Sequence, residues 1–186
     1  MSDRIETDRT MWFSMWFLAS IATFGVAFFP MFYRLIENRN SHFRREADLE
    51  KRIAVFVKNQ GRDAPVFVSR VHEMNARAWA AAIVFVIPVF VMAYFLSKDL
   101  IVHEKHQDTF LSSAFQRRMF MPQTVPIRKY VLLTIVTMGW GIIYWLYKII
   151  NLYNAHFKAQ WAIEKELDTI MEDDKNWQAH VGNAGL

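Results

Sequence analysis

The stretch TMGWGIIYWLYKIINLYNAHF, residues 137–157, decides how this sequence of 186 residues is interpreted. Its first part belongs to an apolar run at 130–147 that contains no charge and is bounded by Lys129 and Lys148. Its second part continues, without Pro or Gly, into a run in which apolar residues recur near heptad spacing among charged ones. The stretch therefore predicts an apolar helix that continues directly into a charged one.

Two further runs contain no charge, at 11–33 and 78–97, and basic residues bound each of them. The three runs have 23, 20 and 18 residues, and about 20 apolar residues are needed to cross the ~30 Å hydrocarbon core of a bilayer. Trp and Tyr gather near their ends, as at membrane interfaces. We therefore expect an all-α integral membrane protein with three transmembrane helices, the alternative being buried core helices.

The distribution of Lys and Arg gives an expected orientation. Residues 34–77 and 148–186 together hold 14 of the 22 basic residues, and the other two flanks hold 8. Because basic residues favour the cytoplasmic side, we expect a multi-pass protein of the cell (plasma) membrane with its N-terminus outside and its C-terminus in the cytoplasm. The first run is longer than a signal-peptide core and follows an acidic segment, so it is interpreted as permanent.

Residues 18–51 align with 132–165 at a constant offset of 114, with 11 of 34 positions identical. Hydrophobic bias does not explain the shared N-x-H-F, which we interpret as an interfacial structural motif. An odd number of intervening spans predicts a parallel repeat with two long charged helical arms on one side. The motif residues are Asn40, His42, Phe43, Asn154, His156 and Phe157, and the expected helix-packing residues are Gly25, Gly139 and Gly141, with Ala47 against Trp161 between the arms.

The run TMGWGIIYWLYKIINLYN at 137–154 resembles the signature of a prokaryotic family of small helical membrane proteins known only as a domain of unknown function. The features that carry the resemblance are T-x-G, the aromatic Y-W-L-Y-K and a following Asn. Residues 18–51 carry it weakly, as a second copy. The family has no established activity, so the resemblance implies a fold unit and no chemistry.

These observations divide the chain into seven expected segments. A tail at 1–10 precedes repeat 1, a span plus a cytoplasmic arm, at 11–58. A linker at 59–77 and a middle span at 78–97 lead to an extracytoplasmic loop at 98–129. Repeat 2, again a span plus an arm, covers 130–175, and a C-terminal tail covers 176–186.

Two groups of residues are candidate metal ligands. Asp99, His103 and His106 fall on one helical face, and two His with a carboxylate suit a divalent first-row metal. Met119 and Met121 follow nearby, and thioether sulfur suits Cu(I). The favoured interpretation is a polar helix with solvated His. The repeat also predicts that His42 and His156 approach each other, with a metal or proton site as the less favoured role.

Catalytic signatures are lacking in the sequence. The chain has no Cys, no Gly-rich phosphate loop and no hydrolase or zinc-protease motif, and no charged or His side chain lies inside an expected span. The basic residues alternate with acidic ones, so no nucleic-acid partner is expected. Catalytic residues are therefore none, and the expected cofactors are none, with bound lipid as the exception and metal disfavoured.

The expected function is a non-catalytic accessory or scaffold subunit of a larger multi-subunit integral membrane complex. By analogy alone, the complex would be a membrane copper monooxygenase such as ammonia monooxygenase, or a respiratory complex. A self-assembling homo-oligomer is the first alternative, and a small metal-binding or transport protein is the second. The expected partners are membrane lipids and other integral membrane subunits, with no small-molecule substrate of its own.

Overall fold

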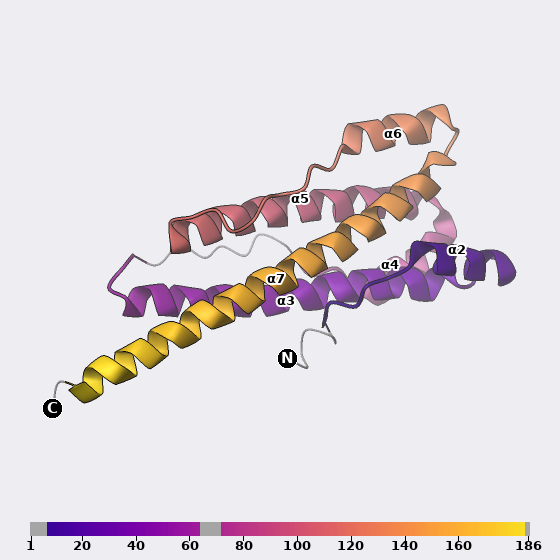
Figure 1. Ribbon diagram of the computed structural model, residues 1–186. Coiled ribbons are helices and arrows are strands. Elements are labelled where there is room, and N and C mark those ends of the chain that lie inside the picture. The colour runs from indigo at the N-terminus through magenta and orange to yellow at the C-terminus, as the bar shows by residue number, and fades with distance from the viewer. Residues whose placement is uncertain (1–6, 64–71, 185–186) are drawn as a thin grey trace.

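A computed structural model describes residues 7–63 and 72–184, with side chains described as far as residue 173. The described chain is helical. Three long helices run along the molecule (Figure 1) and three short segments pack at one end of it. The long helices are α3 (Phe28–Asn59), α5 (Ile87–Phe115) and α7 (Gly141–Ala184); the short segments are α2 (Phe13–Ala22), α4 (Ala76–Ala82) with the 3-10 helix η1 (Ile83–Phe85), and α6 (Ile127–Val136).

Each short segment reverses through a tight turn into the long helix that follows it, so the chain forms three helical hairpins. A residue other than glycine adopts a left-handed φ in each turn: Phe24 at 50°, Val86 at 52° and Met138 at 51°. Left-handed φ is uncommon for such side chains and marks a point where a helix cannot continue. The three turns lie at the same end of the molecule, on the right in Figure 1.

The repeated T-x-G is the turn of the first and third hairpins. The Oγ1 atoms of Thr23 and Thr137 each donate to the carbonyl four residues earlier, at 2.7 Å in both copies, and accept the N–H four residues later. Gly25 and Gly139 have φ values of 93° and 101°, and their N–H groups bond carbonyls five residues back. This is the C-terminal capping that ends a helix at a left-handed glycine. In the second hairpin, Pro88 instead sits in the first turn of α5, where proline is tolerated.

No helix in the described part of the chain is both long enough and apolar enough to cross a membrane. The predicted transmembrane helices at 11–33, 78–97 and 130–147 are therefore wrong. The integral-membrane fold class, the multi-pass plasma-membrane location and the orientation built on those helices are wrong with them. The physical reason is that every charge-free run contains a chain reversal, so no run forms one continuous helix. The all-α expectation agrees with the structure, and residues 98–115, expected in an external loop, continue α5.

Within the described part of the chain, buried apolar residues form two clusters. The first lies toward the turns and contains residues such as Met31, Ile36, Leu96 and Trp145. The second lies further along the long helices and is built on residues that include Leu49, Ile53, Phe110 and Leu167. Buried polar side chains occupy the stretch of α3, α5 and α7 between the two: His42, Glu46, His103, Glu104, Gln107, His156 and Gln160. Packing of three helices does not by itself need polar residues in the interior, so this polar layer between two apolar clusters calls for a separate explanation.

Each long helix holds the segment that leads into the short helix of another hairpin. On α3, Asn40 donates to the carbonyl of Met74 at 2.7 Å and accepts its N–H at 3.1 Å. On α7, the repeat-related Asn154 makes the same pair of bonds with Met11, at 2.6 and 2.9 Å. On α5, Glu104 accepts the N–H of Gln123 at 2.5 Å. These contacts link the three hairpins in a cycle, with the long helices at its centre.

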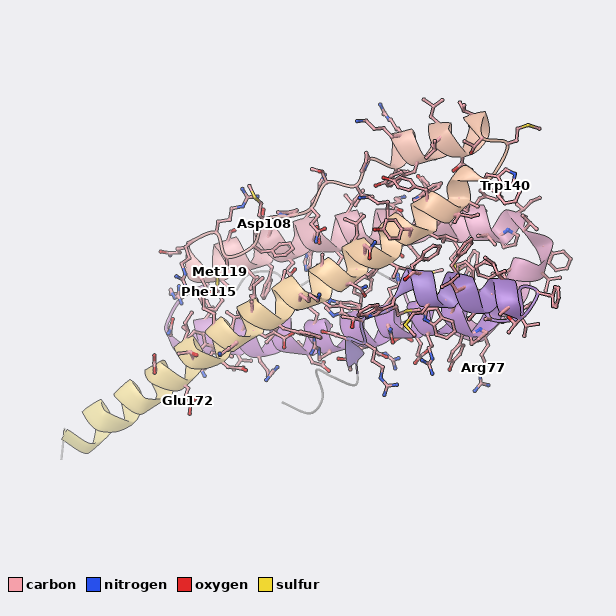
Figure 2. All side chains as sticks on the ribbon, turned by 45° about the vertical axis from the view of Figure 1, so that its right-hand side comes forward. Arg77, Asp108, Phe115, Met119, Trp140 and Glu172 are labelled. Atoms are coloured by element: carbon pink, nitrogen blue, oxygen red, sulfur yellow. The ribbon has the colours of Figure 1, made fainter. Side chains whose placement is uncertain are left out.

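Many aromatic and aliphatic side chains project from the end of the molecule that carries Trp140 (Figure 2). Charged side chains are concentrated along the long helices instead. The turns thus form one apolar end of an otherwise polar bundle.

Candidate metal centre

Each long helix brings one histidine to the polar layer. His42 lies 18 residues after the left-handed Phe24, and His156 lies 18 residues after Met138. His103 follows the left-handed Val86 by 17 residues. Since the turns lie together and a helix rises about 1.5 Å per residue, spacings that differ by at most one residue place the three imidazoles near one level of the bundle.

The three imidazoles and the carboxylate of Glu46 converge on one point. One ligand atom from each of the four lies within 4.8 Å of all the others. The Nε2 atoms of His42 and His156 are 3.0 Å apart, and Glu46 Oε2 is 2.6 Å from His103 Nε2. All four side chains are buried. Imidazole nitrogen and carboxylate oxygen at this separation are a donor set for a divalent first-row ion.

Carboxylates hold the outer nitrogen of two of the three histidines. His42 Nδ1 lies 2.9 Å from Asp8 Oδ1, and His156 Nδ1 lies 3.0 Å from Glu104 Oε1. A carboxylate that accepts the Nδ1–H fixes the imidazole orientation and directs the Nε2 lone pair inward, as carboxylate–histidine pairs do around protein-bound metals. Both rings therefore present Nε2 to the centre of the cluster.

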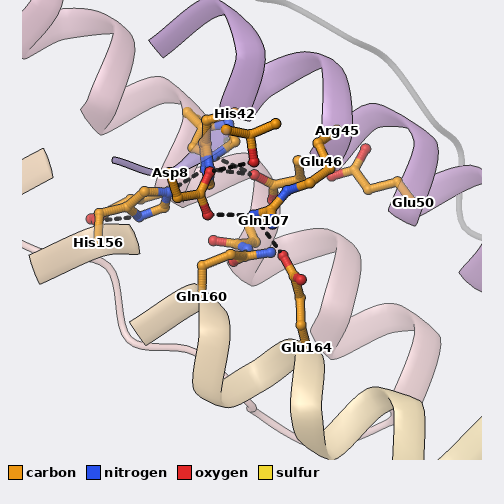
Figure 3. A network of polar contacts seen from close by, with 12 residues as sticks. Asp8, His42, Arg45, Glu46, Glu50, Gln107, His156, Gln160 and Glu164 are labelled. Carbon is orange, nitrogen blue, oxygen red and sulfur yellow. Dashed lines mark hydrogen bonds and ion pairs between the residues drawn. The ribbon is translucent and has the colours of Figure 1, made fainter. Parts of the chain in front are cut away.

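A wider polar network fixes Asp8 in turn (Figure 3). Asp8 Oδ2 accepts from Trp161 Nε1 at 2.8 Å and from the Arg45 guanidinium, which also pairs with Glu164 at 2.9 Å. The other oxygen of Asp8 remains with His42. Asp8 is thus held on both sides by donors from α3 and α7.

The charges around the site set its protonation in the ion-free protein. Burial alone would lower the pKa of His42, but the hydrogen bonds and charges of Asp8 and Glu46 raise it to about 9. Burial alone would raise the pKa of Glu46, yet His103 and His42 hold it well below its usual value. Burial and the neighbouring imidazoles hold the pKa of His156 well below its usual value. His42 is therefore cationic at neutral pH and His156 is neutral.

Two atoms of the cluster make a close but poorly aligned contact. His103 Nε2 and Glu46 Oε2 are buried and lie 2.6 Å apart, at ion-pair distance, although the geometry is not that of a hydrogen bond. Glu46 Oε2 also lies 3.3 Å from His42 Nε2. One cation among these atoms would contact all three, so the geometry fits a bound metal as well as a proton-linked pair.

The other candidate ligands predicted from the sequence lie elsewhere. Asp99 pairs with Arg39 at 2.6 Å, and His106 lies 3.3 Å from Glu50. Met119 packs against the second apolar cluster, and Met121 is 77% exposed. His103 therefore does not form a site with Asp99 and His106. It lies instead beside His42 and His156, the two histidines that the repeat relates.

Sequence reasoning missed Glu46, Asp8 and Glu104. Glu46 follows His42 by four residues, so both lie on one face of α3, and this spacing was a signal that the sequence contained. The role of Glu104 depends on the position of α5 between α3 and α7, which no local pattern encodes. Asp8 comes from the segment before α2, and its contact spans 34 residues of sequence.

The remaining motif and packing residues support the site or the turns. The ring centroids of Phe43 and His103 are 4.3 Å apart, and those of Phe157 and His42 are 4.8 Å apart. Trp161, expected opposite Ala47, donates to Asp8. Gly141 allows the α6–α7 hairpin to close, because a Cβ at this position would lie 2.7 Å from a backbone atom of Thr134.

Comparison of the chain with family models, curated proteins and solved structures finds no significant match. The resemblance of residues 137–154 to a family of unknown function stays a prediction.

Proposed function

We propose that this protein binds one divalent first-row transition-metal ion between α3, α5 and α7, and that the ion holds the three hairpins together. The observation that carries the proposal is the convergence of three imidazole nitrogens and one carboxylate oxygen within 4.8 Å, inside the core. The ligands are His42, Glu46, His103 and His156. Asp8 and Glu104 support two of them from outside.

The ligand set favours a structural ion. Four protein ligands complete the tetrahedral coordination that zinc takes in structural sites, whereas catalytic zinc keeps one position open for water. All four ligand side chains are buried, with exposed fractions of 0–7%. Burial of every ligand supports a role in stability.

Binding in such a site is coupled to folding. The ligands come from positions up to 114 residues apart in the sequence, so the unfolded chain offers no assembled site. The free energy of ion binding therefore adds to the free energy of unfolding. The ion would join the long helices at the layer where apolar packing is interrupted.

The accessory-subunit role expected from the sequence stays a prediction, as do its homo-oligomeric alternative and the absence of catalysis. Of the functions considered from the sequence, metal binding is the one that the site favours. No contact of the described residues selects a partner subunit.

The test is the metal content of the full chain. Protein stripped with a chelator is dialysed against Zn²⁺, Mn²⁺ or, without oxygen, Fe²⁺, passed through gel filtration and analysed by mass spectrometry. We expect one ion per chain for the wild type and a loss of most of it in His103→Ala and His156→Ala. The matched control is His72→Ala, because His72 is an exposed histidine outside the site.

Two results would overturn the proposal. One is a folded wild type that retains none of the three metals. The other is retention that is equal in the wild type and in the site variants, since the bound ion would then lie elsewhere. Circular dichroism of each variant shows whether the helices are kept.

A further inference from the structure

The three turns expose an unusually apolar surface. We define the apolar cap as residues 10–33, 78–97 and 130–147, which contain no charged side chain. Phe24 and Met138, at the tips of two turns, are 99% and 93% exposed. Other exposed side chains of the cap are large and apolar as well: Phe85, Val86, Ile87, Val136 and Trp140. Contiguous exposed apolar surface of this kind marks an interaction site.

The cap also contains a cleft of about 810 Å³ between the hairpins. Side chains from all three hairpins line it, and nearly all of them are apolar; Phe17, Phe32, Phe90 and Leu146 are examples. An apolar cleft open to water is unfavourable. Its occupant should therefore be apolar and flexible enough to fill the space between helices.

A basic residue stands at each of the six points where the chain enters or leaves the cap, and we call these six residues the basic ring: Arg9, Arg34, Arg77, Lys98, Lys129 and Lys148. The Arg34 guanidinium lies 5.5 Å from the Trp16 ring centroid. Tyr33, Tyr94 and Tyr147 lie within a few residues of these positions and are partly exposed. A ring of basic and aromatic residues below an apolar surface matches the headgroup region of a bilayer with anionic lipids.

The depth of the cap fits half a bilayer. Helix α2 has 10 residues, which corresponds to a length of about 15 Å. The hydrocarbon core is about 30 Å thick, so one leaflet is about 15 Å deep. We propose that the apolar cap inserts into one leaflet of an anionic bilayer, with the basic ring at the headgroups and lipid acyl chains in the cleft.

This attachment differs from the spans predicted from the sequence, because no helix crosses the bilayer and all three hairpins return to the same side. The metal centre would lie outside the lipid, since His156 is eight residues beyond Lys148 on α7. Membrane insertion is inferred from the cap alone and does not depend on whether the protein binds a metal.

Vesicle flotation tests the proposal. The full chain is mixed with vesicles of phosphatidylcholine, with or without added phosphatidylglycerol, and centrifuged in a density gradient. We expect the wild type to float, and brominated acyl chains to quench its Trp fluorescence. The double variant Phe24→Asp and Met138→Asp should bind at least about a hundredfold more weakly, because two large apolar side chains no longer enter the lipid and two charges would have to enter it instead.

Folding is not the reason for that loss, since both side chains are almost fully exposed and Asp tolerates the left-handed φ better than Phe or Met. The matched control is Val55→Asp, an exposed apolar residue of α3 outside the cap, which should float like the wild type. Replacing Arg128 and Lys129 with Gln should weaken binding to anionic vesicles by about fivefold for each charge removed.

Three results would overturn the proposal. A wild type that stays at the bottom of the gradient as a monomer has no affinity for lipid. A wild type that stays there as an oligomer, dispersed by the double variant, uses the cap to bind a second copy. Equal loss of flotation in Val55→Asp and in the double variant would show that the cap is not the contact.

Discussion

Replacing Asp8 with Asn should weaken metal binding although residue 8 is not a ligand. One oxygen of Asp8 accepts from His42 Nδ1, and the other accepts from Trp161 and the Arg45 guanidinium. An Asn side chain has only one oxygen. The oxygen should face the two donors that include the charged guanidinium, since charge-assisted hydrogen bonds are the stronger ones. The amide NH₂ then faces His42, whose Nδ1 must become the acceptor.

This change selects the wrong tautomer of the imidazole. With Nδ1 accepting, the proton of neutral His42 moves to Nε2, the atom that must bind the ion. Loss of an outer carboxylate partner typically costs 10- to 100-fold in metal affinity. Because the tautomer itself is reversed, we expect the upper end, about 100-fold, which equals about 2.7 kcal/mol. The comparison is made above about pH 9, where His42 carries no extra proton in the wild type and the effect of Asp8 on its pKa does not contribute.

Competition with a chromophoric chelator measures the affinity, and ¹⁵N NMR of the histidine side chains reports the tautomer. The matched control is Asp48→Asn, because Asp48 is an exposed carboxylate of α3 that pairs with Lys51 at 2.8 Å, away from the site. Its affinity should equal that of the wild type. An affinity of Asp8→Asn within a factor of about two of the wild type would show that Asp8 does not set the tautomer of His42.

Three further outcomes follow from the same structure. Zn²⁺ at about 100 times its Kd should stabilise the fold by about 2.7 kcal/mol and raise Tm by about 5–10 °C; a shift of equal size in His103→Ala would contradict the site. Since the pKa of His42 is raised to about 9 in the ion-free protein, the ion must displace a proton. Its affinity should therefore rise about tenfold per pH unit from neutral pH up to about 9 and then level off, and a pH-independent affinity in a competition titration would contradict this. Gly141→Ala should destabilise the protein by about 1–3 kcal/mol in urea unfolding, because the new Cβ meets the Thr134 backbone at 2.7 Å; unchanged stability would show that the hairpin relaxes freely.

The helical content and the repeat can be recognised in the sequence, but the hairpins cannot be recognised from the length of the charge-free runs. A charge-free run of about 20 residues has the length of a span whether or not it reverses direction. The T-x-G at 23–25 and 137–139 was recognised as a repeated element, and its shared Gly is the residue that permits the reversal. Val86 has no such sequence signal, so its left-handed turn depends on the fold around it and was not predictable from the chain alone.

The sequence predicts only part of the metal centre, because its patterns are local to one helix or one repeat. The offset of 114 related His42 to His156, and the structure brings their Nε2 atoms to 3.0 Å. The sequence makes His103 a candidate ligand but groups it with neighbours on its own helix. Helical periodicity finds residues on one face of one helix, whereas this site takes one histidine from each of three helices. Only the nearly equal spacing from the three turns relates the three histidines, and no sequence pattern marks all three turns.

X-ray absorption spectroscopy of the chain loaded with one equivalent of Zn²⁺ reports on all four proposed ligands in one measurement. We expect about four nitrogen or oxygen ligands at about 2.0–2.1 Å, with the multiple-scattering signature of three imidazoles. His103→Ala should lose one imidazole from that signature, and His72→Ala should leave it unchanged. A shell of six oxygen ligands with no imidazole signature would contradict the proposed metal centre.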